Sequence, residues 1–136
     1  MTSKQMTVFI ENRKGRLGEI LSVLKANNVN ILSMSLADTS EYGLLRIIAD
    51  QPQAGKIALT SAGFSCMLTD VFILQVPHTP GALQNILQTI ADEELSVEYM
   101  YGLSVAGEEA SIVVKTSDTD KAEQVFEKYG IVTLSL

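Results

Sequence analysis

An internal repeat constrains this chain more than any other feature of its sequence. A glycine followed by four aliphatic residues recurs 66 residues later, and the two sets are Gly15, Leu17, Ile20, Leu21, Leu24 and Gly81, Leu83, Ile86, Leu87, Ile90. Met34 recurs as Met100 at the same spacing, after which the spacing becomes 67, as from Gly63 to Gly130. One residue is therefore inserted between the second and third strands of the second copy. We predict two tandem domains, residues 1–69 and 70–136.

Both copies have the same order of predicted elements. Runs rich in β-branched and apolar residues predict strands at 6–11, 29–37, 44–49 and 64–68, then at 71–76, 95–105, 110–116 and 131–136. The repeated aliphatic positions have the spacing i, i+3, i+4, i+7, which predicts a helix after the first strand of each copy. A second helix carries the same spacing at Ala122, Val125, Phe126 and Tyr129, and a weaker apolar stripe at Ala54, Ile57 and Ala58.

The order βαββαβ predicts the α+β, ferredoxin-like fold class. Right-handed crossovers place both helices on one face of a four-stranded antiparallel sheet. Both faces of the second strand in the first copy are largely apolar: one carries Val29, Ile31, Ser33, Ser35 and Ala37, and the other carries Leu32, Met34 and Leu36. Because the helices cover only one face of the sheet, we expect self-association through a sheet face or an edge strand.

Composition excludes several classes of function. The formal net charge is −6, whereas a nucleic-acid surface needs a basic stripe. No apolar run approaches the ~20 residues that span a bilayer, and the first fifteen residues do not resemble a signal peptide. One cysteine and one histidine cannot form a disulfide or a structural zinc site. We expect a cytoplasmic protein with no metal, no other cofactor and no contact with nucleic acid or membrane.

Two functions that ferredoxin-like proteins can carry fit the loops poorly. A metal chaperone needs a cysteine pair in its first loop, but Cys66, which we interpret as a small buried apolar residue, lies elsewhere. An acylphosphatase-like enzyme would hold phosphate near Arg13, Lys14 and Arg16, beside a helix N-terminus. The plain interpretation of these three side chains is a solvated loop with surface cations. The second copy lacks them, and no partner acid or base stands out, so we predict no enzymatic activity.

Two segments of the first copy carry a resemblance to a known family. The run from Glu11 through Asn12 and Gly15 to Leu17, followed by Asn28-Val29-Asn30-Ile31, resembles the ACT domain. It is similar in particular to the regulatory ACT domain of D-3-phosphoglycerate dehydrogenase and to the small subunit of acetolactate synthase. The resemblance covers both copies and implies a regulatory module that binds a free amino acid.

The resemblance also implies a set of ligand-binding residues. Asn12 stands where the serine-binding members have an asparagine three residues before the motif glycine, and Asn30 stands where a second asparagine reaches the ligand from a neighbouring domain. A histidine found in those members is replaced by Ile10. The predicted ligand-binding residues are Asn12, Arg13, Lys14, Gly15, Leu17 and Asn30 in the first copy and His78, Gly81 and Ser96 in the second. His78 and Ser96 occupy the places of the two asparagines, so the two half-sites differ.

The chemistry of these residues agrees with such a ligand. Asparagine offers both a donor and an acceptor to an amino-acid zwitterion, and the helix that follows Gly15 offers free backbone N–H groups. Asn12 and Asn30 lie at opposite ends of one predicted helix, so two domains must contribute to one site. The second contributor is either the second copy of the same chain, through Ser96, or the first copy of another chain, through Asn30. We therefore predict a non-catalytic amino-acid sensor with its ligand between ACT-like domains. It forms a homodimer or higher homo-oligomer, with a separate metabolic enzyme as a further partner. The alternative is a structural or interaction subunit that no longer binds ligand.

Overall fold

A computed structural model describes residues 1–11, 13–38, 41–106 and 108–136. Asn12, one of the predicted ligand residues, lies outside these ranges. The chain divides into two compact units, of which the first is Lys4–Thr69 and the second is Asp70–Leu136 together with Met1–Ser3. No helix in the described ranges is both long enough and apolar enough to cross a membrane.

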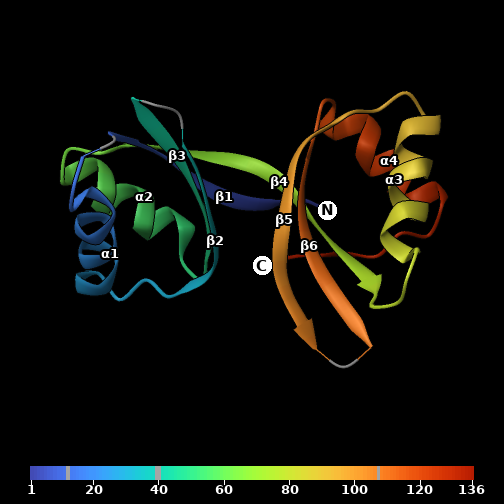
Figure 1. The fold of residues 1–136 in the computed structure, drawn as a ribbon, viewed down its shortest axis with the longest axis horizontal. Helices are drawn as coiled ribbons and strands as arrows, with labels where there is room; N and C mark the ends of the chain where they lie inside the picture. Colours follow the sequence, from blue (N-terminus) through green and yellow to red (C-terminus); the bar gives the residue numbers. More distant parts are fainter. Residues whose placement is uncertain (12, 39–40, 107) are drawn as a thin grey trace. The chain divides into compact units, whose positions relative to one another are not determined.

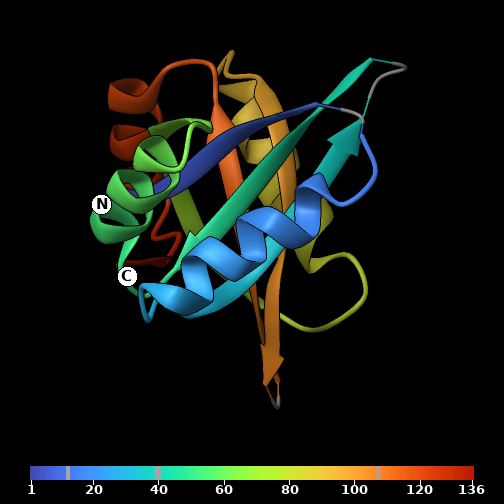
Figure 2. The same cartoon turned by 90° about the vertical axis from the view of Figure 1, so that its left-hand side faces the viewer.

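The elements of the first unit follow the predicted order (Figure 1). They are β1 (Ser3–Glu11), α1 (Arg16–Ala26), β2 (Ile31–Asp38), β3 (Tyr42–Ala49), α2 (Pro52–Ser61) and the first part of β4 (Ser65–Pro77). The strands lie in the order β2-β3-β1-β4, and β3 is antiparallel to both of its neighbours. Figures 1 and 2 show α1 and α2 on the same face of this sheet.

The second unit repeats this arrangement. Its elements are the second part of β4, α3 (Ala82–Asp92), β5 (Val97–Ala106), β6 (Glu109–Thr116), α4 (Thr119–Lys128) and β7 (Thr133–Leu134). The strand order is β5-β6-β4-β7, and all the pairings are antiparallel. The predicted α+β, ferredoxin-like fold is confirmed in both units.

Strand β4 differs from the prediction of two separate strands. It runs without a break from Ser65 to Pro77, through Thr69 and Asp70. The segment contains no glycine, and its only proline is its last residue, so no residue within it interrupts extended backbone. The last strand of the first copy is therefore also the first strand of the second.

The core of the first unit lies between its helices and the helix-facing side of its sheet. Helix α1 buries Ile20 and Leu24 in that core, as the aliphatic spacing predicts. The helix begins after Gly15, whose φ of 86° is unfavourable for residues with a Cβ. It ends at Asn27, and Asn28 adopts a φ of 57°, a conformation that asparagine tolerates better than most residues.

Helix α2 buries a different face from the one predicted. Gly55 and Leu59 are its buried residues, whereas Ile57 is 66% exposed. The helix crosses β1 so closely that a Cβ on Gly55 would lie 2.5 Å from Sδ of the fully buried Met6. The closest contact between α2 and β1 is thus made at a glycine, which an apolar sequence pattern cannot reveal.

The core of the second unit contains an aromatic pair. Phe72 of β4 and Phe126 of α4 contact each other edge to face, with ring centroids 4.9 Å apart. The predicted stripe of α4 is confirmed at Ala122, Val125 and Phe126, which are buried. Tyr129 is outside the core, and its hydroxyl donates a hydrogen bond of 2.5 Å to Oε1 of Glu93.

Candidate functional site

The glycine loop of the first unit forms one end of the candidate site. No side chain of the described residues caps α1 after Gly15, and Arg16 N–H donates to the Arg13 carbonyl, so the N–H groups of Leu17 and Gly18 remain available for a ligand. Three of the predicted ligand residues, Arg13, Gly15 and Leu17, line a small pocket of about 150 Å³ here. The other lining residues are Ile10, Glu11, Leu36 and Gly43. Lys14 is exposed and does not line this pocket.

The cations of this loop are not equivalent. Nε of Arg13 lies 3.8 Å from a Glu11 carboxylate oxygen, and both side chains are more than half exposed. Arg16 donates to Glu19 at 2.6 Å, and its guanidinium lies 4.2 Å from the ring centre of Phe64. The Arg16 side chain is only 16% exposed, so the interpretation of all three cations as surface groups is wrong for this one. Arg16 packs against Phe64 and anchors the start of the helix.

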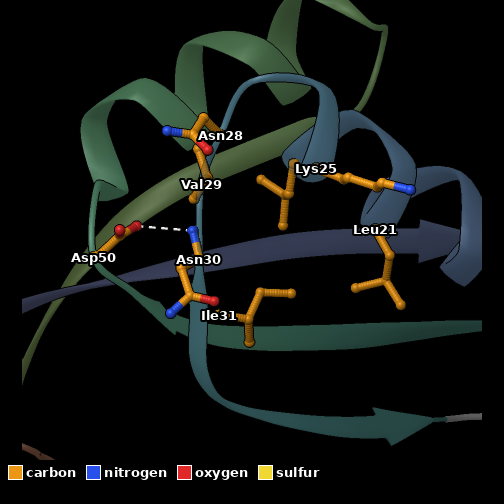
Figure 3. Close-up of a pocket in the computed structure, with 8 residues that line it drawn as sticks. Leu21, Lys25, Asn28, Val29, Asn30, Ile31 and Asp50 are labelled. Carbon is orange, nitrogen blue, oxygen red and sulfur yellow. Dashed lines mark hydrogen bonds between the residues drawn. The ribbon is translucent and has the colours of Figure 1, made fainter.

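Asn30 lies in a second pocket, at the other end of α1 (Figure 3). This pocket has a volume of about 410 Å³. Its lining residues are Leu21, Leu24, Lys25, Asn28, Val29, Asn30, Ile31 and Asp50. The backbone N–H of Asn30 donates to Oδ1 of Asp50 at 2.8 Å, and the Asn30 carbonyl accepts from the Asp50 N–H at 3.0 Å.

The side chain of Asn30 takes no part in holding this backbone. Its amide projects away from the Asp50 carboxylate (Figure 3). Among the residues that the structure describes, the amide has no hydrogen-bond partner. Asn30 is thus positioned through its main chain, and its donor and acceptor remain available.

The two pockets of the first unit are too far apart to hold one small ligand. Helix α1 separates them and has 11 residues, so it is about 17 Å long. The structure therefore brings Arg13, Gly15 and Leu17 together and leaves Asn30 apart from them, as the sequence spacing indicates.

The second unit has the equivalent parts with different side chains. Gly81 precedes α3 with a φ of 84°, close to the value at Gly15. His78 lies in a pocket of about 420 Å³ beside the β5–β6 hairpin. Ser96 precedes β5, and its N–H donates to Oγ of Ser117 at 3.1 Å, in the manner of Asn30 and Asp50.

Sequence reasoning missed Asp50, although a signal for it exists. Asp50 and Ser117 each follow the third strand of their copy and differ in number by the repeat spacing of 67. Both supply a side-chain acceptor to the residue before the second strand. The position that holds this segment is therefore repeated in both copies, although its amino-acid type differs.

Neither metal chemistry nor a reactive thiol emerges from the described ranges. No group of three or more His, Cys, Asp or Glu side chains comes together there as a metal site. Cys66 is half-buried against the core of the first unit. Burial raises the pKa of its thiol to about 11, against a smaller lowering effect of Lys56.

Cys66 is therefore expected to react slowly with thiol reagents in the folded protein. A pKa of about 11 leaves roughly one thiol in a thousand ionised at pH 8, and the thiolate is the reactive form. Alkylation by iodoacetamide should be roughly a hundredfold slower than for free cysteine. Mass spectrometry measures the fraction of alkylated protein over time. The urea-unfolded chain is the control and should react at the free rate. Equal rates in the folded and unfolded protein would contradict this expectation.

Comparison with known proteins places these features in a wider group. A family model described as an ACT domain pair matches residues 1–132. Protein BT0572 from Bacteroides thetaiotaomicron is 33% identical over 98% of this chain and 92% of that chain, with a TM-score of 0.93. No curated protein matches the sequence.

More distant solved structures share the fold. The regulatory subunit of aspartate kinase from Thermus thermophilus is 13% identical, with a TM-score of 0.68 over 93% of this chain and 90% of that one. The corresponding subunit from Thermus flavus is 14% identical, with a TM-score of 0.62 over 92% and 90% of the two chains.

Proposed function

Since this chain belongs to the family of paired ACT domains, we propose that it is a regulatory protein that binds a free L-amino acid and catalyses no reaction. The proposed division into domains is residues 1–69 and 70–136. The two regulatory subunits of aspartate kinase that share the fold support a regulatory role by analogy. The ligand would control either the assembly of this chain or a separate metabolic enzyme.

The observation that carries this proposal is the pair of incomplete half-sites at the two ends of α1. The loop at Gly15 offers backbone N–H groups, with Arg13 beside them, to a carboxylate. The pocket at the other end offers the free amide of Asn30 and the Asp50 carboxylate, which can accept from an ammonium group. An amino-acid zwitterion needs both kinds of partner, so we place the ligand between the first units of two chains. Asn12, Lys14 and Leu17 complete the proposed loop half-site.

Amino-acid binding is expected to raise the melting temperature. A ligand that binds only the folded state at a hundredfold excess over its Kd adds about 2.7 kcal/mol of stability, which corresponds to a rise of several degrees. Differential scanning fluorimetry against the twenty amino acids at millimolar concentration tests this. If no amino acid changes the melting temperature, the chain is instead an interaction subunit that has lost its ligand.

The outer edge of β2 is the proposed dimer contact. Among the described strands, β2 pairs only with β3. It presents Leu32, Met34 and Leu36, which are 42%, 38% and 49% exposed. Met34 and Leu36 are opposite Ile47 and Leu45 of the core, so they belong to the helix-facing side of the sheet at its margin. An open strand edge with exposed apolar side chains is stabilised by pairing with another chain.

Met34→Asp is expected to weaken this dimer by at least about tenfold in Kd, because a carboxylate would lose its hydration in the contact. Sedimentation velocity over a concentration series measures the effect. Ile57→Asp is the matched control, since Ile57 is 66% exposed on α2 and should leave the dimer intact. The β2 contact is wrong if Ile57→Asp dissociates the dimer and Met34→Asp does not. A parent chain that is monomeric at all concentrations removes the dimer altogether.

A further inference from the structure

The described parts of the two glycine loops have the same backbone hydrogen bonds. In the first unit Arg13 N–H donates to the Glu11 carbonyl at 2.7 Å, and Arg16 N–H donates to the Arg13 carbonyl at 3.2 Å. The equivalent bonds in the second unit are Thr79 to Pro77 at 2.9 Å and Ala82 to Thr79 at 3.2 Å. The glycines that follow have φ values of 86° and 84°. We therefore compare the two pockets through their side chains and the strands beside them.

One wall of the pocket differs between the units. Leu36 of β2 fills space in the first unit, where its Cδ1 would lie 3.3 Å from a Cβ placed on Gly43. At the repeat spacing of 66, the second unit has Gly102 in place of Leu36, and a Cβ on Gly102 would have no atom of the described residues within 4 Å. The first pocket has a volume of about 150 Å³ and the second about 420 Å³. The two pockets have two equivalent lining positions, Leu36/Gly102 and Gly43/Ala110, and at the first of these the second unit has no side chain.

The residue inserted into the second copy lies at the same wall. The pairing register shifts near the start of both β2 and β5. In β5 the described pairing has a second shift, a bulge between Gly102 and Ser104. This bulge takes up the extra residue inside β5, rather than in the connection between strands as the sequence suggested. A bulge re-aims the side chains around it. Leu103 and Ser104 both line the enlarged pocket.

The lining of the enlarged pocket selects a kind of ligand. His78, Ser104 and Ser111 can each donate a hydrogen bond, and no carboxylate lines the pocket within the described part of the chain. The imidazole of His78 has no hydrogen-bond partner there. Leu103, Ala110 and Ile112 supply an apolar surface. Pro77 and Thr79, the counterparts of the charged Glu11 and Arg13, do not line this pocket and carry no charge.

We propose that the pocket between His78 and the Gly102–Ser104 bulge is a second ligand site, which binds a small carboxylate with an uncharged, apolar side chain. The donors meet the carboxylate, and the apolar wall takes the side chain in the room that Leu36 occupies in the first unit. This inference rests on the proposed function and adds to it a site of different selectivity. An amino acid and the corresponding 2-oxo acid share the required chemistry.

Calorimetry on the full chain tests the site with four probes: L-leucine, 4-methyl-2-oxopentanoate, L-glutamate and L-lysine. Gly102→Leu restores the side chain of the first unit and should weaken binding of L-leucine, of its 2-oxo acid, or of both by more than about tenfold. Gln53→Leu is the control for the added leucine, because Gln53 is exposed on α2 and lines none of the proposed ligand pockets. It should bind as the parent does. Comparison of the two leucine-derived probes shows whether the ammonium group is needed.

The outcomes separate this site from the proposed function. Binding of a leucine-derived probe that is lost in Gly102→Leu and kept in Gln53→Leu supports the site. Should Gly102→Leu fail to fold, His78→Ala, a change in an exposed loop, is expected to give the same loss. Equal binding by the parent and Gly102→Leu overturns the second site and leaves amino-acid binding intact. If only L-glutamate or L-lysine binds, and Gly102→Leu abolishes that binding, the proposed ligand class is wrong. If none of the twenty amino acids and neither leucine-derived probe binds, both proposals fail.

Discussion

Replacing Gly55 with leucine is expected to destabilise the protein by about 3 kcal/mol, the upper end of the usual cost of overpacking a core. Leucine is a better helix former than glycine by roughly 0.8 kcal/mol, so helix propensity alone predicts the opposite sign. Packing decides the outcome, because a Cβ at this position would lie 2.5 Å from Sδ of Met6 and 3.4 Å from Cδ2 of Leu24. Both of those side chains are almost fully buried and have little room to move aside.

Gly18→Leu provides the matched control for this prediction. Gly18 also lies inside a helix, but a Cβ there would have no atom within 4 Å. This variant should be more stable than the parent by somewhat less than 1 kcal/mol. Urea unfolding followed by far-ultraviolet circular dichroism measures both changes. If Gly55→Leu gained stability as Gly18→Leu does, the close approach of α2 to β1 would be wrong.

Helix α2 shows where apolar periodicity fails as a guide. Ala54, Ile57 and Ala58 have the spacing of a buried stripe, yet Ile57 is the most exposed large apolar side chain of the described chain. The actual contact is made by Gly55 and Leu59, four residues apart. Periodicity weights positions by the apolar character of their side chains, so it gives no weight to a glycine whose role is to let two backbones approach.

The repeat carried most of what the sequence revealed of the fold. An element that is clear in one copy supports the equivalent element in the other. The clear apolar stripe of α4, for example, supports the prediction of helix α2. The repeat predicts two strands with a boundary after Thr69, but neither Thr69 nor Asp70 interrupts extended backbone, so β4 is continuous. The burial of Arg16 depends on Phe64, 48 positions away, and local spacing carries no record of such a contact.

The candidate site was predictable in its parts but not in its volumes. Gly15, Gly81 and Asn30 stand out because the backbone geometry of a loop and a strand entry depends on residue type. The linings of the two pockets include Leu36 and Gly102, which lie in strands about twenty residues beyond Gly15 and Gly81. Their influence requires knowledge of which strand residues surround each loop, which only the tertiary structure supplies.

Asn30→Ala is expected to weaken amino-acid binding by roughly 5-fold to 150-fold while leaving the fold unchanged. Loss of a hydrogen-bonding group from a site that the ligand buries costs about 1–3 kcal/mol. The fold should persist because Asn30 is held by its main chain, through the two hydrogen bonds to Asp50, and alanine keeps both of them. Asn12→Ala, at the loop half-site, is expected to have an effect of the same order.

Asn85→Ala is the matched control for Asn30→Ala. Asn85 is exposed on α3, so its loss should change neither binding nor melting temperature. The ligand is the amino acid that gives the largest thermal shift with the parent, and calorimetry measures its Kd for each variant. A lower melting temperature for Asn30→Ala in the absence of ligand would mean that its amide stabilises the fold. Binding equal to that of the parent would show that the ligand does not reach this end of α1. Because the half-site at Gly15 is about 17 Å away, a loss of binding at Asn30 together with a loss at Asn12 would require two units to share one ligand.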